Sequence, residues 1–311
     1  MDERSRALVG LGRALREVGY TFVTVTPETH RRVDARAAAA GRVRAESLRD
    51  VFGWSRPFEP SLLPPGMIEL ARAADVLVEE RALLRSRVRF SSLHGELFVH
   101  SAYPTLAADS VFFGPDTYRF CDLVAAQMAG KRAQRAVDVG CGSGAGGIIA
   151  ARHAEHVVLA DVNPAALVYA KVNAALADVS SKVTTATSDV LAGVEGPIDL
   201  VVANPPYMVD RASRTYRDGG GAFGEALAVR IAREALERLR PGGKLVLYTG
   251  AAVARGGTDT FLDAVRGVCG DRAEWSYWEI DPDVFGEEIE QNDAYAAVER
   301  IAAVALVASV R

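Results

Sequence analysis

An Asn-Pro-Pro-Tyr segment at 204–207 follows directly on an apolar run at 198–203. The apolar run predicts a buried strand, and Pro205 and Pro206 end it abruptly because neither can donate to a sheet ladder. Pro205 also holds Asn204 in an extended conformation. The segment therefore predicts a rigid corner at the carboxyl end of a strand, where open α/β sheets bind their ligands.

This corner has the groups needed to recognise a planar NH2 group. The side-chain oxygen of Asn204 and the carbonyl of Pro205 can accept its two hydrogens, and Tyr207 can stack on the flat system behind it. The nitrogen lone pair would then be free to face an electrophile. Taken alone, the segment is equally consistent with a turn that only ends a strand.

A glycine-rich loop follows an earlier predicted strand, in the sequence Asp138-Val-Gly140-Cys141-Gly142-Ser-Gly144. Glycines let a backbone approach a ligand and adopt positive φ. The stretch 142–147 also fits the dinucleotide pattern Gly-x-Gly-x-x-Gly. Asp138, however, would face the pyrophosphate of a dinucleotide, and it suits an ammonium-bearing ligand better.

Further polar residues end the next two predicted strands. Asp161 is placed to bind both hydroxyls of a ribose, and Asn163 follows it at the start of a helix. Ser188, Asp189 and Val190 end the third strand, where Asp189 could accept from an adenine amino group. Each acid alone could be a helix cap or a surface turn, but together with the glycine loop and the corner they predict one ligand site.

From residue 135 onward, short apolar runs alternate with helical patterns. This alternation predicts a mostly parallel sheet covered by helices on both faces. The last two strands follow one another without a helix, which predicts an antiparallel strand near one edge. The predicted strands cover 136–139, 157–160, 183–187, 198–203, 244–249, 275–280 and 301–310.

Residues 1–107 have a different pattern. Helices are predicted at 3–19, 33–52 and 66–85, followed by a β-hairpin at 87–100 that turns at His94-Gly95. This order predicts a small α+β, winged-helix-like domain for recognition of a substrate or partner. Its arginines could contact phosphates or form a solvated face. Asp116 or Thr117 is predicted to cap the first helix of the following domain.

The composition sets limits on the protein class. The 311 residues carry a net charge of −4, which gives no global argument for nucleic-acid binding. Residues 1–107 contain 16 Arg and 13 acids, and the remainder contains 20 basic and 27 acidic residues. The three cysteines form neither a disulfide framework nor a metal motif. Without a signal-peptide or membrane-spanning pattern, a cytoplasmic protein that binds neither membrane nor metal is expected.

With these motifs, residues 108–311 resemble the class I S-adenosylmethionine-dependent methyltransferases. The corner is similar to that of amino-group N-methyltransferases, which include HemK-like glutamine methyltransferases and the "methyltransferase small domain" RNA enzymes. The resemblance implies a Rossmann-like seven-stranded sheet in the order 3-2-1-4-5-7-6, with strand 7 antiparallel. It also implies S-adenosyl-L-methionine as the cofactor.

The resemblance further implies residue roles. Asp138 and the glycine loop would hold the methionine end of the cofactor, Asp161 the ribose, and Asp189 with Val190 the adenine. Asn204, Pro205, Pro206 and Tyr207 would present the substrate nitrogen. The complete set expected to contact the cofactor is Thr117, Asp138, Gly140, Cys141, Gly142, Gly144, Asp161, Val162, Asn163, Ser188, Asp189, Val190 and Asn204.

The sequence thus predicts methyl transfer from S-adenosylmethionine to a planar amino nitrogen, an amide or a nucleobase NH2, of a protein or RNA. The alternatives are a small-metabolite N-methyltransferase, a cofactor-binding module without catalysis, and an NAD-dependent oxidoreductase. Residues 1–107 do not match the helical bundle of the glutamine methyltransferases. The glycine-rich stretch at 216–222 could be a substrate flap or a long surface loop.

Overall fold

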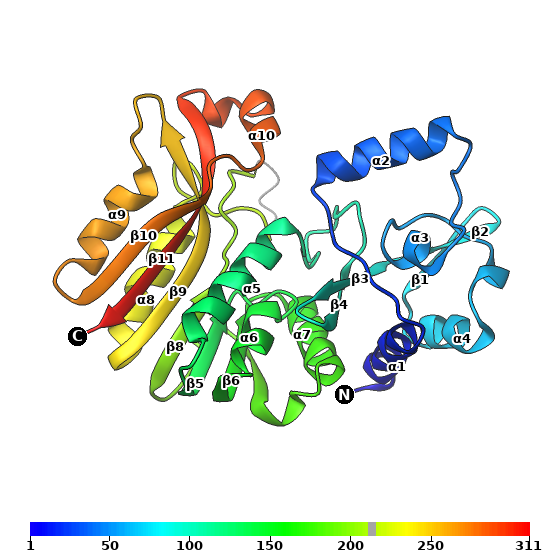
Figure 1. Ribbon diagram of the computed structural model, residues 1–311, viewed down its shortest axis with the longest axis horizontal. Helices are drawn as coiled ribbons and strands as arrows, with labels where there is room; N and C mark the ends of the chain where they lie inside the picture. Colours follow the sequence, from blue (N-terminus) through cyan, green and yellow to red (C-terminus); the bar gives the residue numbers. More distant parts are fainter. Residues whose placement is uncertain (211–215) are drawn as a thin grey trace.

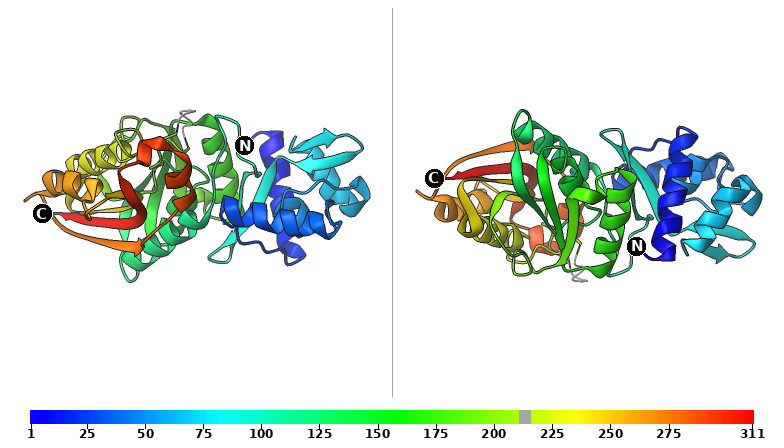
Figure 2. Two further views of the ribbon diagram at one scale, coloured as in Figure 1. Left: turned by 90° about the horizontal axis from the view of Figure 1, so that it is seen from above. Right: turned by 90° about the horizontal axis from the view of Figure 1, so that it is seen from below.

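The computed structural model describes residues 1–210 and 216–311. It has two parts, an N-terminal α+β region and a larger region built on one sheet (Figure 1). Seen from above and below, the two parts lie end to end, and the α1 helix (Glu3–Glu17) is at their junction (Figure 2).

The large sheet has seven strands in the spatial order β10-β11-β9-β8-β5-β6-β7. Strand β11 is antiparallel to both of its neighbours, and the other pairings are parallel. Numbered within this sheet, the order is 3-2-1-4-5-7-6, which confirms the prediction. The strands are β5 (Ala133–Val139), β6 (Ala154–Asp161), β7 (Val183–Thr187), β8 (Ile198–Ala203), β9 (Leu239–Ala254), β10 (Ala273–Asp281) and β11 (Val298–Val310).

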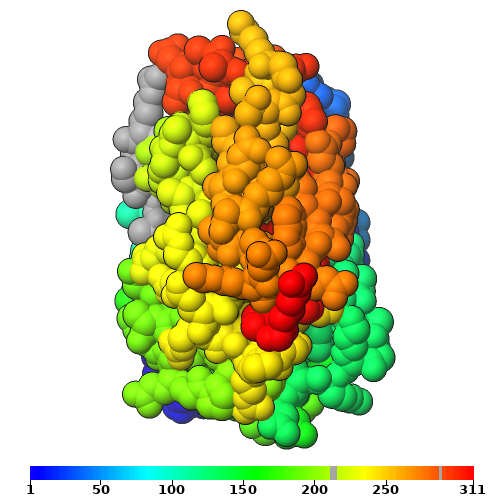
Figure 3. Space-filling view, turned by 90° about the vertical axis from the view of Figure 1, so that its left-hand side faces the viewer, coloured from blue at the N-terminus to red at the C-terminus, as the bar shows by residue number. Residues whose placement is uncertain are grey.

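Helices cover both faces of the sheet, and each face has its own apolar core. On one face lie α5 (Pro115–Met128), α6 (Ala145–Ala150), α7 (Pro164–Leu176) and the unpredicted α10 (Gly286–Gln291). The other face is covered by α8 (Ala226–Arg238) and α9 (Thr260–Cys269). Figure 3 shows the end of the molecule that carries α8 and α9, where the two helices pack side by side and the C-terminal residue reaches the surface.

The N-terminal region contains α1, α2 (Pro27–Ala39), α3 (Leu48–Phe52) and α4 (Pro65–Ala73), a short 3-10 turn (Pro60–Leu62) and two hairpins. The hairpin of β3 (Val88–Leu93) and β4 (Glu96–Ser101) is antiparallel and turns at His94-Gly95, as predicted.

Two helix predictions in this region are wrong in part. The segment 33–52 is not one helix: Thr26 and Pro27 start α2 earlier, and Gly41, at φ +73, follows its end. The segment 77–86 is a second hairpin, β1 (Leu77–Glu80) and β2 (Leu83–Ser86), rather than the end of a helix. Its composition is typical of a helix, but Leu84 pairs with the distant Phe58, so non-local pairing overrides local propensity.

The N-terminal region packs on helix α7 of the large region. Val172 and Leu176 of α7 belong to the same apolar core as α1 and the β3–β4 hairpin. A Cβ on Gly12 of α1 would lie only 2.7 Å from the Leu176 side chain, so this glycine allows a close approach. The boundary at 107/108 stays a prediction, since the two regions share an apolar core that includes α7.

Candidate active site

A cavity of about 410 Å³ lies at the carboxyl ends of the central strands. Its size is typical of small-molecule sites. It brings together every predicted site residue except Gly144. The residues that line it are Thr117, Asp138, Gly140, Cys141, Gly142, Asp161, Val162, Asn163, Ser188, Asp189, Val190, Asn204, Pro205, Pro206 and Tyr207.

The glycine loop forms one wall of this cavity. Gly140 and Gly142 adopt positive φ angles of +64° and +52°, which favour glycine. A Cβ on Gly140 would meet no protein atom within 4 Å, so the backbone itself is available to a ligand. Gly144 has a different role from the one expected. It is the N-cap of α6, and its Cβ would lie 3.1 Å from Leu159 and Ala170, so it serves packing.

Two acids stand beside this loop. Asp138 is buried and accepts a hydrogen bond from the Gly147 amide at 2.7 Å. Burial, reinforced by the charge of Asp161, raises the pKa of Asp138 to about 7. Asp161 accepts from the amides of Gly142 and Asn163, each at 2.8 Å, so its carboxylate is fixed relative to the loop. Burial raises the pKa of Asp161 as well.

The third strand end is organised differently. The exposed carboxylate of Asp189 forms a two-bond ion pair with Arg230 of α8, at 2.8 and 3.0 Å. Ser188 donates to the carbonyl of Val190, which is buried and has φ +50. An adenine amino group would have to share Asp189 with Arg230, and its contact with Asp189 stays a prediction.

The corner leaves one polar side chain without an internal partner. The half-buried Asn204 lines the cavity, and its amide makes no hydrogen bond with any of the residues that the structure describes. Tyr207, in contrast, is buried, and its hydroxyl donates to Asp116 at 2.6 Å. Its ring packs on Gly250, where a Cβ would come within 2.1 Å of the ring.

Asp116 was predicted only as a possible helix cap. In the structure Gly114 is the N-cap of α5, and its amide donates to the Thr117 hydroxyl. Asp116 instead accepts from both Tyr207 and Tyr248, each at 2.6 Å. A buried carboxylate that binds two tyrosines across different strands has no local sequence signal.

The glycine-rich stretch after the corner folds back against it. The amide of Met208 donates to the carbonyl of Arg217, and Gly219 donates to Met208 in return. Tyr216 donates to the carbonyl of Thr105 at 2.7 Å. Tyr216 and Arg217 line the cavity, so this stretch contributes to the candidate site.

A buried amide connects the N-terminal hairpin to the glycine loop. Asn173 of α7 accepts from the Val99 amide at 2.7 Å and donates to the Val99 carbonyl at 2.9 Å. It also donates to the carbonyl of Ser143 at 2.8 Å. Asn173 thus holds the glycine loop in place and also binds strand β4.

The donor set fits S-adenosylmethionine. The buried Asp138 suits its ammonium group, Asp161 suits its ribose hydroxyls, and the open face of Gly140 leaves room for the backbone to approach. Among the described residues, no cluster of three or more His, Cys, Asp or Glu could hold a metal ion. None of the helices in these parts of the chain is both long and apolar enough for a membrane span.

Part of the chain is similar to known methyltransferases. Residues 120–253 match the family "Methyltransferase small domain". The release factor glutamine methyltransferase of Deinococcus radiodurans is 33% identical over 60% of this chain and 64% of its own length. That of Cereibacter sphaeroides is 36% identical over 38% and 48%, respectively. The chain thus spans about half to two thirds of the length of these relatives.

Solved structures confirm the fold. A tRNA methyltransferase of M. jannaschii superposes with a TM-score of 0.50 at 18% identity, covering 72% of this chain and 57% of that one. The family match and the relatives confirm the resemblance to HemK-like and methyltransferase small domain proteins, and the cofactor of this class is S-adenosylmethionine.

Proposed function

We propose that this chain, whose residues 120–253 form a methyltransferase small domain, methylates a planar amino nitrogen. The observation that carries the proposal is the Asn204 amide. It lines the same cavity as Asp138, Asp161 and the glycine loop, and no described residue occupies its hydrogen-bonding groups. A half-buried amide that lines a cavity without an internal partner is available to a ligand that supplies one.

The residues of the corner would orient the acceptor. The side-chain oxygen of Asn204 and the carbonyl of Pro205 accept the two hydrogens of the NH2 group. The rigid prolines fix the positions of both acceptors. The cofactor supplies an electrophilic methyl group. A delocalised amino nitrogen is a poor nucleophile, and the corner itself contributes no basic side chain. Catalysis therefore rests on positioning and electrostatics rather than on prior proton removal.

A protein or an RNA is the proposed acceptor. Relatives named for release factor glutamine and for small-subunit ribosomal RNA support both classes. A small metabolite is the alternative within enzymes. A cofactor-binding module without catalysis is the alternative outside them, and the NAD-dependent enzyme has no support from the family match.

The test separates binding from chemistry. Calorimetric titration with S-adenosylmethionine and with NAD should show saturable binding of the first only. Methyl-labelled cofactor is then incubated with RNA, protein and metabolite pools. Asn204→Ala should lower turnover at least 100-fold while cofactor affinity changes less than about 5-fold. Gln127→Ala, an amide on α5 that does not line the cavity, is the matched control. Undiminished turnover of Asn204→Ala would refute the proposal.

A further inference from the structure

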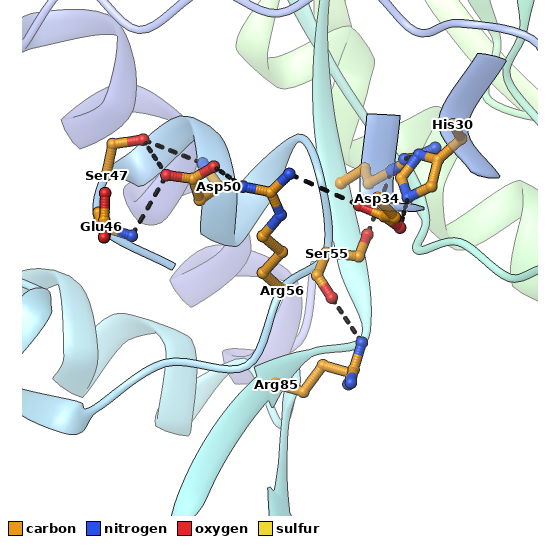
Figure 4. Close-up of polar contacts among 9 residues, drawn as sticks. His30, Asp34, Glu46, Ser47, Asp50, Ser55, Arg56 and Arg85 are labelled. Atoms are coloured by element: carbon orange, nitrogen blue, oxygen red, sulfur yellow. Dashed lines mark hydrogen bonds and ion pairs between the residues drawn. The ribbon is translucent and has the colours of Figure 1, made fainter. Parts of the chain in front are cut away.

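A second cavity, of about 240 Å³, lies in the N-terminal region. It adjoins the first cavity, because Tyr103 and Pro104 line both. The remaining wall comes from α2, the segment that follows α2, the loop after α3 and strand β2. Figure 4 shows the polar side chains of this region, with Arg56 placed between Asp34 and Asp50. The charged, histidine and tryptophan residues that line the cavity are His30, Asp34, Arg42, Trp54, Arg56 and Arg85.

Three arginines, Arg42, Arg56 and Arg85, and one acid, Asp34, line the cavity. Arg56 also pairs with Asp50 and Arg85 with Glu80, so the cationic character of the cavity depends on Arg42. His30 adds no charge near neutral pH, because burial and the nearby Arg89 lower its pKa to about 4. The side chain of the exposed Arg42 makes no hydrogen bond or ion pair with any described residue, so its guanidinium is available to an anion.

Arg56 is held in a fixed position. Its Nη1 donates to Asp50 at 2.9 Å, and Asp50 in turn accepts from the Ser47 hydroxyl at 2.8 Å (Figure 4). Only 12% of the Arg56 side chain is exposed, so it is oriented before any ligand arrives. Preorganised cations of this kind bind an anion with little loss of conformational entropy.

One carboxylate oxygen of Asp34 accepts a hydrogen bond, and the other does not. Arg89 donates to Nδ1 of His30 at 2.6 Å, which leaves the opposite ring nitrogen to donate to Asp34 Oδ2 at 3.0 Å. The other oxygen, Oδ1, lies 3.6 Å from Arg56 and has no hydrogen-bond donor among the described residues. This oxygen is closed off from solvent and lies next to the Arg56 cation, so it helps to hold Arg56 rather than to bind a ligand.

Two aromatic rings complete the cavity. Trp54 packs edge-on against Phe22, with ring centroids 5.3 Å apart, and beside His30 at 5.2 Å. Tyr103 lies 4.2 Å from the His30 ring and 5.6 Å from the Arg89 guanidinium carbon. Both rings are fixed by neighbours and border the cavity, so they can hold a flat group.

We propose that this cavity binds one nucleotide of a single-stranded nucleic acid, while a neighbouring nucleotide of the same strand enters the first cavity. The phosphate would contact Arg42, and the base would pack on Trp54. The proposal rests on the proposed function, because it names the substrate class that reaches the corner.

Charge distribution favours a polyanion at this place. Residues 1–107 have 16 arginines against 13 acids, whereas the remainder has 20 basic and 27 acidic residues. A polyanion is therefore attracted to the region that contains the second cavity and repelled elsewhere. A phosphopeptide would bind the free arginine, but it would leave the two aromatic rings without a partner.

The test is fluorescence polarisation with the whole chain. The probes are a fluorescein-labelled single-stranded 12-nucleotide RNA, the DNA of the same sequence, and a labelled phosphoserine peptide. Saturable binding of RNA or DNA is expected. Arg42→Gln should weaken it about 5- to 10-fold and lower the salt slope by about 0.7, the contribution of one phosphate on a single strand. Arg233→Gln, an exposed arginine on α8 outside both cavities, should change neither.

Two further variants separate this inference from the proposed function. Trp54→Leu should weaken nucleic-acid binding as well, with an unchanged melting temperature as the check of folding. Asn204→Ala should still bind the strand saturably through the intact second cavity, although its turnover falls at least 100-fold. Methyl transfer without nucleic-acid binding, equal affinity of Arg42→Gln and Arg233→Gln, or binding of the phosphopeptide alone would overturn the inference and leave the proposed function standing.

Discussion

The hydroxyl of Tyr207 donates a hydrogen bond to Oδ2 of Asp116 at 2.6 Å, although the two residues are 91 positions apart. Tyr248 donates to the other oxygen of the same carboxylate, also at 2.6 Å. Burial and the charge of Asp116 raise the pKa of Tyr207, so it remains a protonated donor. Asp116 therefore fixes the corner that carries Asn204, and the Tyr207 ring is a wall of the cavity.

Tyr207→Phe should lower turnover about 10-fold and leave the affinity for S-adenosylmethionine unchanged. The ring stays, but the corner loses its attachment to Asp116 and the carboxylate loses one of its donors, which costs about 1–3 kcal/mol of stability. Turnover and a denaturant melt measure both effects. Tyr277→Phe on β10 is the control, since its hydroxyl binds Asp259, the N-cap of α9, outside the cavity. Equal turnover of the two variants would contradict a positioning role.

Gly250→Ala should disturb the same corner from the opposite side. Its Cβ would lie 2.1 Å from the Tyr207 ring, so the ring or strand β9 must shift. We expect a lower melting temperature and reduced turnover, because overpacking a core costs about 1–3 kcal/mol. Gly267→Ala on α9 has open space around the new Cβ and should be neutral or stabilising. Wild-type turnover in Gly250→Ala would show that the ring position is not required.

Asn173→Ala should destabilise the protein by about 3 kcal/mol. It removes hydrogen bonds to both backbone groups of Val99 and to the carbonyl of Ser143, leaving these buried groups unsatisfied. Because Ser143 belongs to the glycine loop, cofactor affinity should fall as well. Lys171→Ala, an exposed position on the same helix, is the control for helix propensity. A loss of stability without a loss of affinity would mean that the loop holds its shape alone.

The parallel sheet was predictable because its signals are local. Apolar runs such as 198–203 and the helix start at Pro164 specify their elements almost without tertiary context. The N-terminal region was less predictable. The stretch 77–86 forms a hairpin because Leu84 pairs with Phe58, and no pattern within the stretch records that contact.

The candidate site likewise has a part that was predictable from the sequence and a part that was not. Asp138, Asp161 and Asn204 lie at the carboxyl ends of β5, β6 and β8, which are neighbours in the sheet, so their meeting in one cavity follows from the parallel topology. The partners of these groups depend on packing between distant elements. Asp116 beneath Tyr207 and Arg230 on Asp189 connect helices with strands far away in the sequence, and only the folded chain reveals them.

The titration of Asp138 predicts a pH dependence of cofactor binding. Burial raises the pKa of this carboxyl to about 7, so it is largely protonated at pH 6 and largely ionised at pH 8. An ammonium group prefers the ionised form, and affinity for S-adenosylmethionine should therefore rise up to about 10-fold between these values. Binding at pH 7 should release protons, which calorimetry in buffers of different ionisation enthalpy measures. Asp138→Asn should bind more weakly and independently of pH, and a pH dependence that persists in this variant would assign the titration to Asp161 instead.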